Sequence, residues 1–189
     1  MRFCRLILAL IFPLWAVIGH TQTTHYRIDP KHTAATMQWQ QIGLSNPSAR
    51  FSGVQGRICV DHSQFENSSV DVNIPVKNMQ TDLGFINQTL QSKAWLNSAQ
   101  YPQMNFKSTQ VRRLDQNQYS ILGTLTIKGI SKPVELTAKL KQFASDQQQK
   151  RVGFIASTKI KRSDFKLTAY APTVSDIIYI QIQTEAFVP

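Results

Sequence analysis

Apolar and polar residues alternate along most of the chain. Every second position is apolar in several segments, most clearly 70–76, 119–127 and 134–140. Because successive side chains of a strand point to opposite faces, this pattern predicts strands with one buried and one solvated face. About eight or nine such segments are present, of a length typical for barrels and sandwiches. We therefore predict an all-β protein built on an antiparallel sheet. Closure into a barrel would remove the exposed edges of that sheet, and a two-layer sandwich is the alternative.

The passage 123–134 predicts a hairpin. It reads GTLTIKGISKPV and lies between alternating strands over 119–128 and 132–143. Gly129 supplies the backbone freedom that a tight turn needs. Pro133 cannot donate a hydrogen bond to a neighbouring strand, so it belongs at the start or the edge of a strand.

One region, residues 82–97, breaks the alternation. Its apolar residues recur at the spacing of one helix face, which predicts a helix or two short helical turns. This excursion could cover one end of the barrel as a plug or lid, with Leu83 and Trp95 as its main apolar contacts.

Residues 1–19 have the pattern of a secretory signal peptide. Arg2 and Arg5 precede an apolar run over 6–18, and the segment ends in small residues. The run is shorter than the about 20 apolar residues of a transmembrane helix. We therefore predict a cleaved signal, export to the periplasm, and a single domain over residues 20–189.

The chain is basic, with 21 Lys and Arg residues against 11 Asp and Glu residues. Without Arg2 and Arg5 of the predicted signal, 19 cations against 11 acids leave a net charge of +8. Such a charge suits acidic partners, anionic membrane surfaces or nucleic acid. The cations are scattered, however, which favours an ordinary solvated surface. The predicted export argues against nucleic acid and leaves a transient membrane contact open.

Motifs for catalysis are sparse. The sequence holds no glycine-rich phosphate loop, no paired-cysteine metal motif and no Gly-x-Ser-x-Gly motif, so neither a cofactor nor a metal is expected. Asp29 and His32 could form a catalytic pair, but a turn in which Asp29 binds backbone amides is favoured. Cys59 is the one cysteine of residues 20–189 and is expected to be buried and unreactive.

Arg162 and Asp164 belong to a second polar cluster, RSDF at 162–165. Arg162 could neutralise the headgroup of a ligand. A structural turn, with a surface ion pair between Arg162 and Asp164, is favoured instead because such turns and pairs are common.

Several motifs, taken in order along the chain, resemble the YceI-like family of secreted polyisoprenoid-binding proteins. They are YRIDPKHT at 26–33, SKAWL at 92–96, GTLTIKGISKPV at 123–134 and RSDF at 162–165. The resemblance implies an extended, lipocalin-like antiparallel barrel of eight strands that holds a long isoprenoid chain. Charged residues that the family often carries near residues 86–97 are missing here. Their loss indicates a divergent member and leaves headgroup recognition at that end open.

The leading hypothesis is a non-enzymatic binding protein for a long apolar lipid, a polyisoprenoid or prenyl quinone, held in the barrel interior. The alternative is a secreted interaction protein with a filled barrel that docks on acidic partners or membrane through its basic surface. An enzyme acting through Asp29 and His32 is a third hypothesis, and a homodimer stays open. The candidate lining residues are apolar, and plain core packing is an equal alternative for each. They are Trp39, Phe51, Ile74, Leu83, Trp95, Phe106, Ile121, Leu125, Phe154 and Phe165.

Overall fold

The computed structural model describes residues 23–41, 45–82, 84–145 and 150–189. The predicted signal over residues 1–19 lies outside these ranges and stays a prediction. Within the described ranges, no helix is both long and apolar enough to cross a lipid bilayer. Strands dominate the structure, which confirms the all-β prediction. They are β1 (Thr23–Ile28), β2 (Ala34–Gln41), β3 (Ser48–Ser52), β4 (Gln55–Asp61), β5 (Ser69–Pro75), β6 (Met79–Gln80), β7 (Gln103–Asp115), β8 (Gln118–Ile127), β9 (Ile130–Ser145), β10 (Lys150–Lys161) and β11 (Val174–Phe187).

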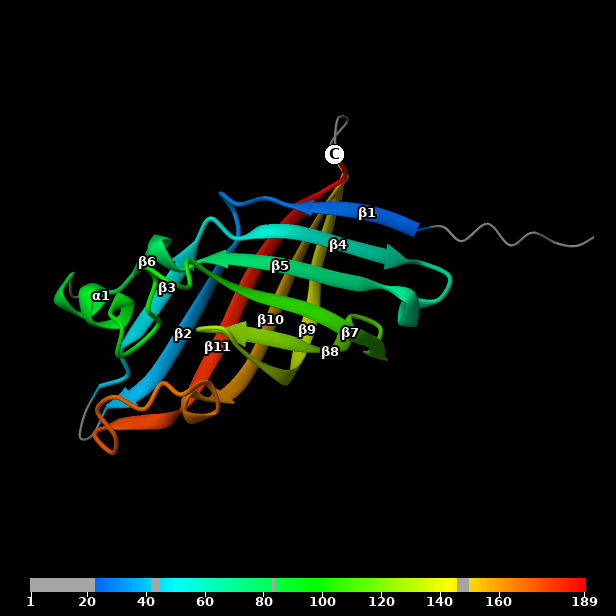
Figure 1. Ribbon diagram of the computed structural model, residues 1–189. Coiled ribbons are helices and arrows are strands. Elements are labelled where there is room, and N and C mark those ends of the chain that lie inside the picture. Colours follow the sequence, from blue (N-terminus) through cyan, green and yellow to red (C-terminus); the bar gives the residue numbers. More distant parts are fainter. Residues whose placement is uncertain (1–22, 42–44, 83, 146–149) are drawn as a thin grey trace, which may run out of the picture.

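These strands form one sheet that closes into a barrel (Figure 1). Around the ring the order is β1, β4, β5, β7, β8, β9, β10 and β11, and β11 pairs with β1 to close it. Neighbouring strands of this ring are antiparallel. Beyond the part of β11 that pairs with β1, the same edge of β11 pairs with β2. Strand β2 then pairs with β3, and β3 pairs with β6. The predicted eight-stranded antiparallel barrel is therefore confirmed.

The two ends of the barrel differ. Helix α1 (Gly84–Gln91) lies at the left end in Figure 1, beside β3 and β6. The β7–β8 turn and the 3-10 turn η1 (Phe65–Asn67) lie at the right end. We call the left end the helix end and the right end the mouth. Helix α1, followed by turns up to residue 96, confirms the helical excursion predicted over 82–97.

The hairpin that joins β8 to β9 turns at Gly129 as predicted, but the turn also includes Lys128, and Pro133 lies within β9 rather than in the turn. Lys128 and Gly129 both have positive φ, 52° and 74°, as a two-residue turn between twisted strands requires. Pro133 lies opposite Thr124 of β8. The pairing of β9 with β10 begins only at Thr137, so Pro133 lies on a free edge of β9 and breaks no ladder on that side.

Gly56 lets the backbone of β4 lie unusually close to that of β5, the strand with which it pairs. Its φ is 154°, and a Cβ atom there would lie 2.1 Å from the carbonyl oxygen of Asp71. We expect Gly56→Ala to lower the free energy of unfolding by about 2–4 kcal/mol, because backbone atoms must move to admit the methyl group. Gly84→Ala is the matched control, since a Cβ at Gly84 meets no atom within 4 Å. Urea unfolding measures the stability of both variants. Equal unfolding midpoints for Gly56→Ala and Gly84→Ala would contradict the close approach of the two backbones.

Candidate functional site

A cavity of about 120 Å³ lies in the middle of the barrel. Every ring strand contributes to its wall, and Thr158 and Thr184 supply the polar side chains among its otherwise apolar lining. A polar ligand placed there would lose its hydrogen bonds to water without replacing them. The central cavity therefore suits a dry, apolar ligand.

A larger cavity of about 330 Å³ opens at the mouth. It adjoins the central cavity, because Ile121, Ala138 and Phe154 line both. Apolar side chains form its inner wall, whereas His62, Arg113 and other polar residues lie among its lining as well. The lumen therefore passes from a partly polar mouth to an apolar centre.

The helix end is nearly filled. A cavity of about 30 Å³ remains there, lined by Trp39, Phe51 and Trp95 among others. The Trp95 ring stacks on Tyr170, with 6.2 Å between the ring centroids, and the Arg162 guanidinium lies 5.2 Å from the Trp95 ring centre. The Trp95 Nε1 atom is buried and has no hydrogen-bond partner among the residues that the structure describes. The aromatic side chains thus close this end.

Arg162 has a structural role, and the predicted surface pair with Asp164 is wrong. Arg162 is only 2% exposed. Its guanidinium donates hydrogen bonds to four backbone carbonyl oxygens, and burial lowers its pKa. The carboxylate that stabilises this turn is that of Asp176, which accepts hydrogen bonds from the amide and the hydroxyl of Ser163 at 2.9 and 2.8 Å. The four carbonyl groups belong to Leu167, Ala169, Val174 and Ser175.

The structure places most of the predicted lining residues in cavity walls. Those of the central cavity are Ile74, Phe106, Ile121, Leu125 and Phe154, and those of the helix end are Trp39, Phe51 and Trp95.

Two predicted residues do not line a described cavity. Phe165 is buried in the core and belongs to none of the three walls, and Leu83 lies outside the described residues. Contact with a ligand stays a prediction for each of the predicted lining residues.

Sequence reasoning missed the small residues that keep the lumen open. Ala138 of β9 and Ala156 of β10 pair with each other and face inward beside Tyr119. Alanine within a row of Leu, Ile and Val is the signal that could have shown them. Gly123 is a related case, because a Cβ there would lie 2.5 Å from the Phe106 ring. The missing side chain lets that ring lie across β8.

Asp61 organises the loop that borders the mouth. Its carboxylate accepts hydrogen bonds from the hydroxyl of Ser63 at 2.6 Å and from the amides of Ser63 and Gln64 at 2.9 Å. These bonds lower the pKa of Asp61 to about 2, and the bond from the Ser63 hydroxyl has the largest effect. The loop leads to Phe65, whose ring lies 5.6 Å from Tyr119 and under the guanidinium of Arg113.

The Asp61 interactions predict acid sensitivity. The folded-state pKa lies below the unfolded value of about 3.9, so ionised Asp61 stabilises the fold fully above pH 4. That contribution is lost as the pH falls from about 4 to about 2. We expect the stability difference between wild type and Asp61→Asn to be constant above pH 5 and to shrink below pH 4. Urea unfolding at several pH values measures it, and a difference that does not change with pH would contradict the assignment.

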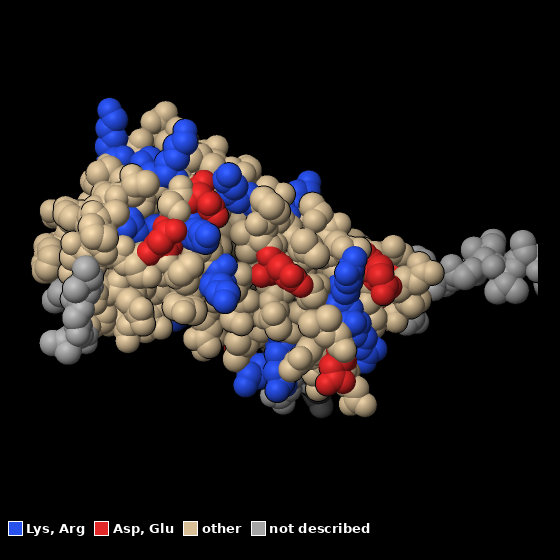
Figure 2. All heavy atoms as spheres, turned by 90° about the horizontal axis from the view of Figure 1, so that it is seen from below, with Lys and Arg blue, Asp and Glu red and all other residues tan. Residues whose placement is uncertain are grey.

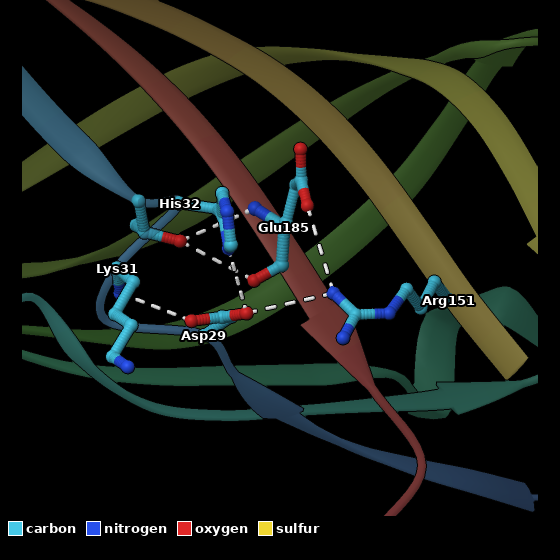
Figure 3. A network of polar contacts seen from close by, with 6 residues as sticks. Asp29, Lys31, His32, Arg151 and Glu185 are labelled. Atoms are coloured by element: carbon cyan, nitrogen blue, oxygen red, sulfur yellow. Dashed lines mark hydrogen bonds and ion pairs between the residues drawn. The ribbon is translucent and has the colours of Figure 1, made fainter. Parts of the chain in front are cut away.

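Asp29 and His32 form a turn at the seam where β1 meets β11 (Figure 3). The Asp29 carboxylate lies 2.8 Å from His32 Nδ1, accepts a hydrogen bond from the amide of Lys31 at 3.0 Å, and lies 3.5 Å from Arg151. The hydrogen bond from His32 is the main cause that lowers the pKa of Asp29. The favoured turn is confirmed, and neither Asp29 nor His32 lines a described cavity.

Other reactive groups are dispersed in the part of the chain that the structure describes. That part contains no cluster of three His, Cys, Asp or Glu side chains that could hold a metal ion. Cys59 is free and half-buried rather than fully buried as predicted. Cys59 lies between Ile58 and Val60 of β4 and is among the residues that line the mouth cavity. On the face seen in Figure 2, Lys and Arg side chains are interspersed with Asp and Glu.

Known proteins are similar to this chain in sequence and in architecture. A family model for the YceI-like domain matches residues 26–186. Protein YceI of Salmonella arizonae is 31% identical over 170 residues, which cover 88% of this chain and 88% of that protein. The crystal structure of the Campylobacter jejuni YceI protein has a TM-score of 0.70 at 29% identity and covers 78% of this chain and 88% of that one.

Two more distant structures share the fold. BcnA of Burkholderia cenocepacia has a TM-score of 0.76 at 21% identity, over 84% of this chain and 98% of that one. A polyisoprenoid binding domain from Saccharophagus degradans, implicated in plant cell wall breakdown, has a TM-score of 0.67 at 12% identity, over 87% of this chain and 98% of that one. The family model matches residues 26–186 and Protein YceI is 31% identical to this chain. The chain therefore belongs to the YceI-like family.

Proposed function

We propose that this protein binds a long apolar lipid, a polyisoprenoid or a prenyl quinone, inside the barrel and performs no chemistry on it. The apolar central cavity carries this proposal, because it joins a wide mouth and has only two threonines as polar lining. Among the described residues that line it there is no Asp, Glu, His, Lys or Cys side chain beside these threonines to act as an acid or a base. The lumen is suited to binding by exclusion of water.

The energetics of burial favour a long chain. Each buried CH₂ group contributes about 0.8 kcal/mol, so an enclosed chain of about 20 carbons offers roughly 16 kcal/mol. Association and ordering cost about 4–15 kcal/mol. A chain long enough to fill the lumen can therefore bind well without polar contacts, whereas a short apolar molecule cannot.

Two further observations support the proposal. The Saccharophagus degradans domain, named as a polyisoprenoid binding domain, has the same fold. The signal pattern over residues 1–19 supports a periplasmic protein.

Fractionation of an exporting bacterial host checks the location, with the mature chain expected in the periplasm and starting near residue 20. Contact with membrane surfaces and pairing into a homodimer remain predictions.

Lipid extraction tests the function. The full chain is expressed in a bacterial host that exports it, purified, and extracted with organic solvent for mass spectrometry. We expect close to one prenyl lipid per protein, and uptake of a prenyl quinone by the delipidated protein that salt hardly changes. A lipid-free protein that also fails to take up the quinone would refute the proposal. Binding of acidic partners that fades with added salt would favour the docking alternative instead.

A further inference from the structure

The polar groups of the lumen are gathered at the mouth. His62 and Ser68 line it on the β4–β5 side, and Arg113, Gln116 and Asn117 line it on the side of the β7–β8 turn. No Asp or Glu is among the residues that line this cavity. The mouth is therefore rich in hydrogen-bond donors and carries positive charge without an acidic neighbour in its wall.

Several of these donors have spare capacity. Arg113 donates from Nε to the carbonyl oxygen of Asp115 at 3.2 Å and from Nη2 to that of Gln116 at 3.1 Å. Its Nη1 atom, and the side-chain amides of Gln116 and Asn117, form no hydrogen bond with another described residue. The Phe65 ring lies 5.2 Å from the Arg113 guanidinium and helps to fix its position. Arg113 is thus held at the rim with donors left for a ligand.

The helix end offers much less to a polar group. The Arg162 guanidinium is committed to four backbone carbonyl groups, and the remaining cavity there is only about 30 Å³. Trp95 Nε1 is the one buried side-chain N or O atom without a partner among the described residues. A headgroup at that end would meet a single neutral donor inside an aromatic plug.

We propose that the mouth is a headgroup subsite and that the lipid binds tail-first. Its last isoprene unit lies toward Trp39 and Trp95, and its head lies against Arg113. The head is an acceptor of hydrogen bonds, best served by an anionic phosphate, because charge-assisted hydrogen bonds from a guanidinium are the strong ones. This inference rests on the proposed function and adds the direction of binding and the chemistry of the head.

Tryptophan fluorescence tests the direction of binding. Trp39 and Trp95 both line the helix end and are the two tryptophans of residues 20–189, so the exported protein without its predicted signal carries two reporters at one end. The probes are a prenyl monophosphate with a nitroxide on its terminal isoprene unit and one with a nitroxide beside the phosphate. Nitroxides quench at short range, so we expect quenching by the first probe and almost none by the second.

Each other outcome has a distinct meaning. Quenching only by the head-labelled probe would overturn the proposal and place the head near Trp95 Nε1. Equal quenching by both probes would also overturn it, because the lipid would then have no fixed direction. Failure of both probes and of unlabelled prenyl lipid to bind would instead refute the proposed function.

A pair of arginine variants tests the headgroup contact. Both Arg112 and Arg113 are exposed on β7, but Arg113 lines the mouth and Arg112 lines none of the three cavities. We expect Arg113→Gln to weaken binding of a prenyl monophosphate roughly 10- to 100-fold. Binding of a prenyl hydrocarbon of the same length should stay unchanged, and Arg112→Gln should affect neither ligand. Equal weakening of both ligands by Arg113→Gln would show a loss of mouth shape and overturn the assigned contact.

Discussion

Ala138→Phe is expected to reduce binding of a long prenyl lipid at least about 100-fold while the barrel stays folded. Ala138 is 2% exposed and lines both the mouth cavity and the central cavity, where they adjoin. A phenyl ring there takes the place of roughly four CH₂ groups of the ligand, worth about 3 kcal/mol. That free energy corresponds to a factor of about 100 in the dissociation constant. Uptake of a prenyl quinone by delipidated protein measures the loss.

Thr137→Phe is the matched control for this variant. Thr137 is the preceding residue of β9 and is exposed on the outer side of the barrel. The same ring there leaves the lumen open, so we expect lipid binding equal to that of the wild type. Thermal unfolding shows whether each variant is folded, and overpacking by Ala138→Phe is expected to cost about 1–3 kcal/mol. A folded Ala138→Phe variant with normal affinity would mean that the lipid binds outside the lumen.

Arg162→Met is expected to lower the free energy of unfolding by about 3–5 kcal/mol. Arg162 begins the 3-10 turn η3 (Arg162–Phe165), and its guanidinium holds the carbonyl groups of the segment 167–175. Methionine fills much of the same volume but leaves these buried acceptors without a donor. Because the same guanidinium covers Trp95, the plug at the helix end should loosen as well.

Two control variants separate charge from geometry. Lys161→Met removes an exposed cation from the preceding position and should change stability by less than about 0.5 kcal/mol. Arg162→Lys keeps the charge but lacks the planar fork that reaches several carbonyl groups at once, so it should restore only part of the loss. Urea unfolding compares the three variants. A loss for Lys161→Met as large as for Arg162→Met would contradict the hydrogen-bond argument.

The sequence was most informative where one face of a strand is buried. The alternating rows over 119–127 and 134–140 became β8 and β9, with their apolar members in the core, because a register slip would expose every one of them to water. The turn at Gly129 was also predictable, because glycine accepts a positive φ, whereas the positive φ of Lys128 was not, because lysine rarely adopts one.

The site was harder to predict than the fold. The predicted lining consists of large aromatic and aliphatic residues, but Trp39 and Trp95 close the helix end while Ala138 and Ala156 leave space in the middle. The alternation of apolar and polar residues predicts which side chains face inward. It does not predict the volume of the space that remains between them. The burial of Arg162 was missed for a related reason: its partners are backbone carbonyl groups of a later segment, which leave no pattern in the sequence.

The pairing of β1 with β11 has a consequence for biogenesis. The ring is closed by Arg27 opposite Phe187 and Ile28 opposite Ala186, contacts between nearly the first and the last residues of the domain. Contacts so distant in sequence form slowly, and they require the C-terminal strand to be present. Truncation of the final strand should therefore prevent ring closure rather than shorten the barrel, and the proposed lipid could enter the lumen only after the whole polypeptide is complete.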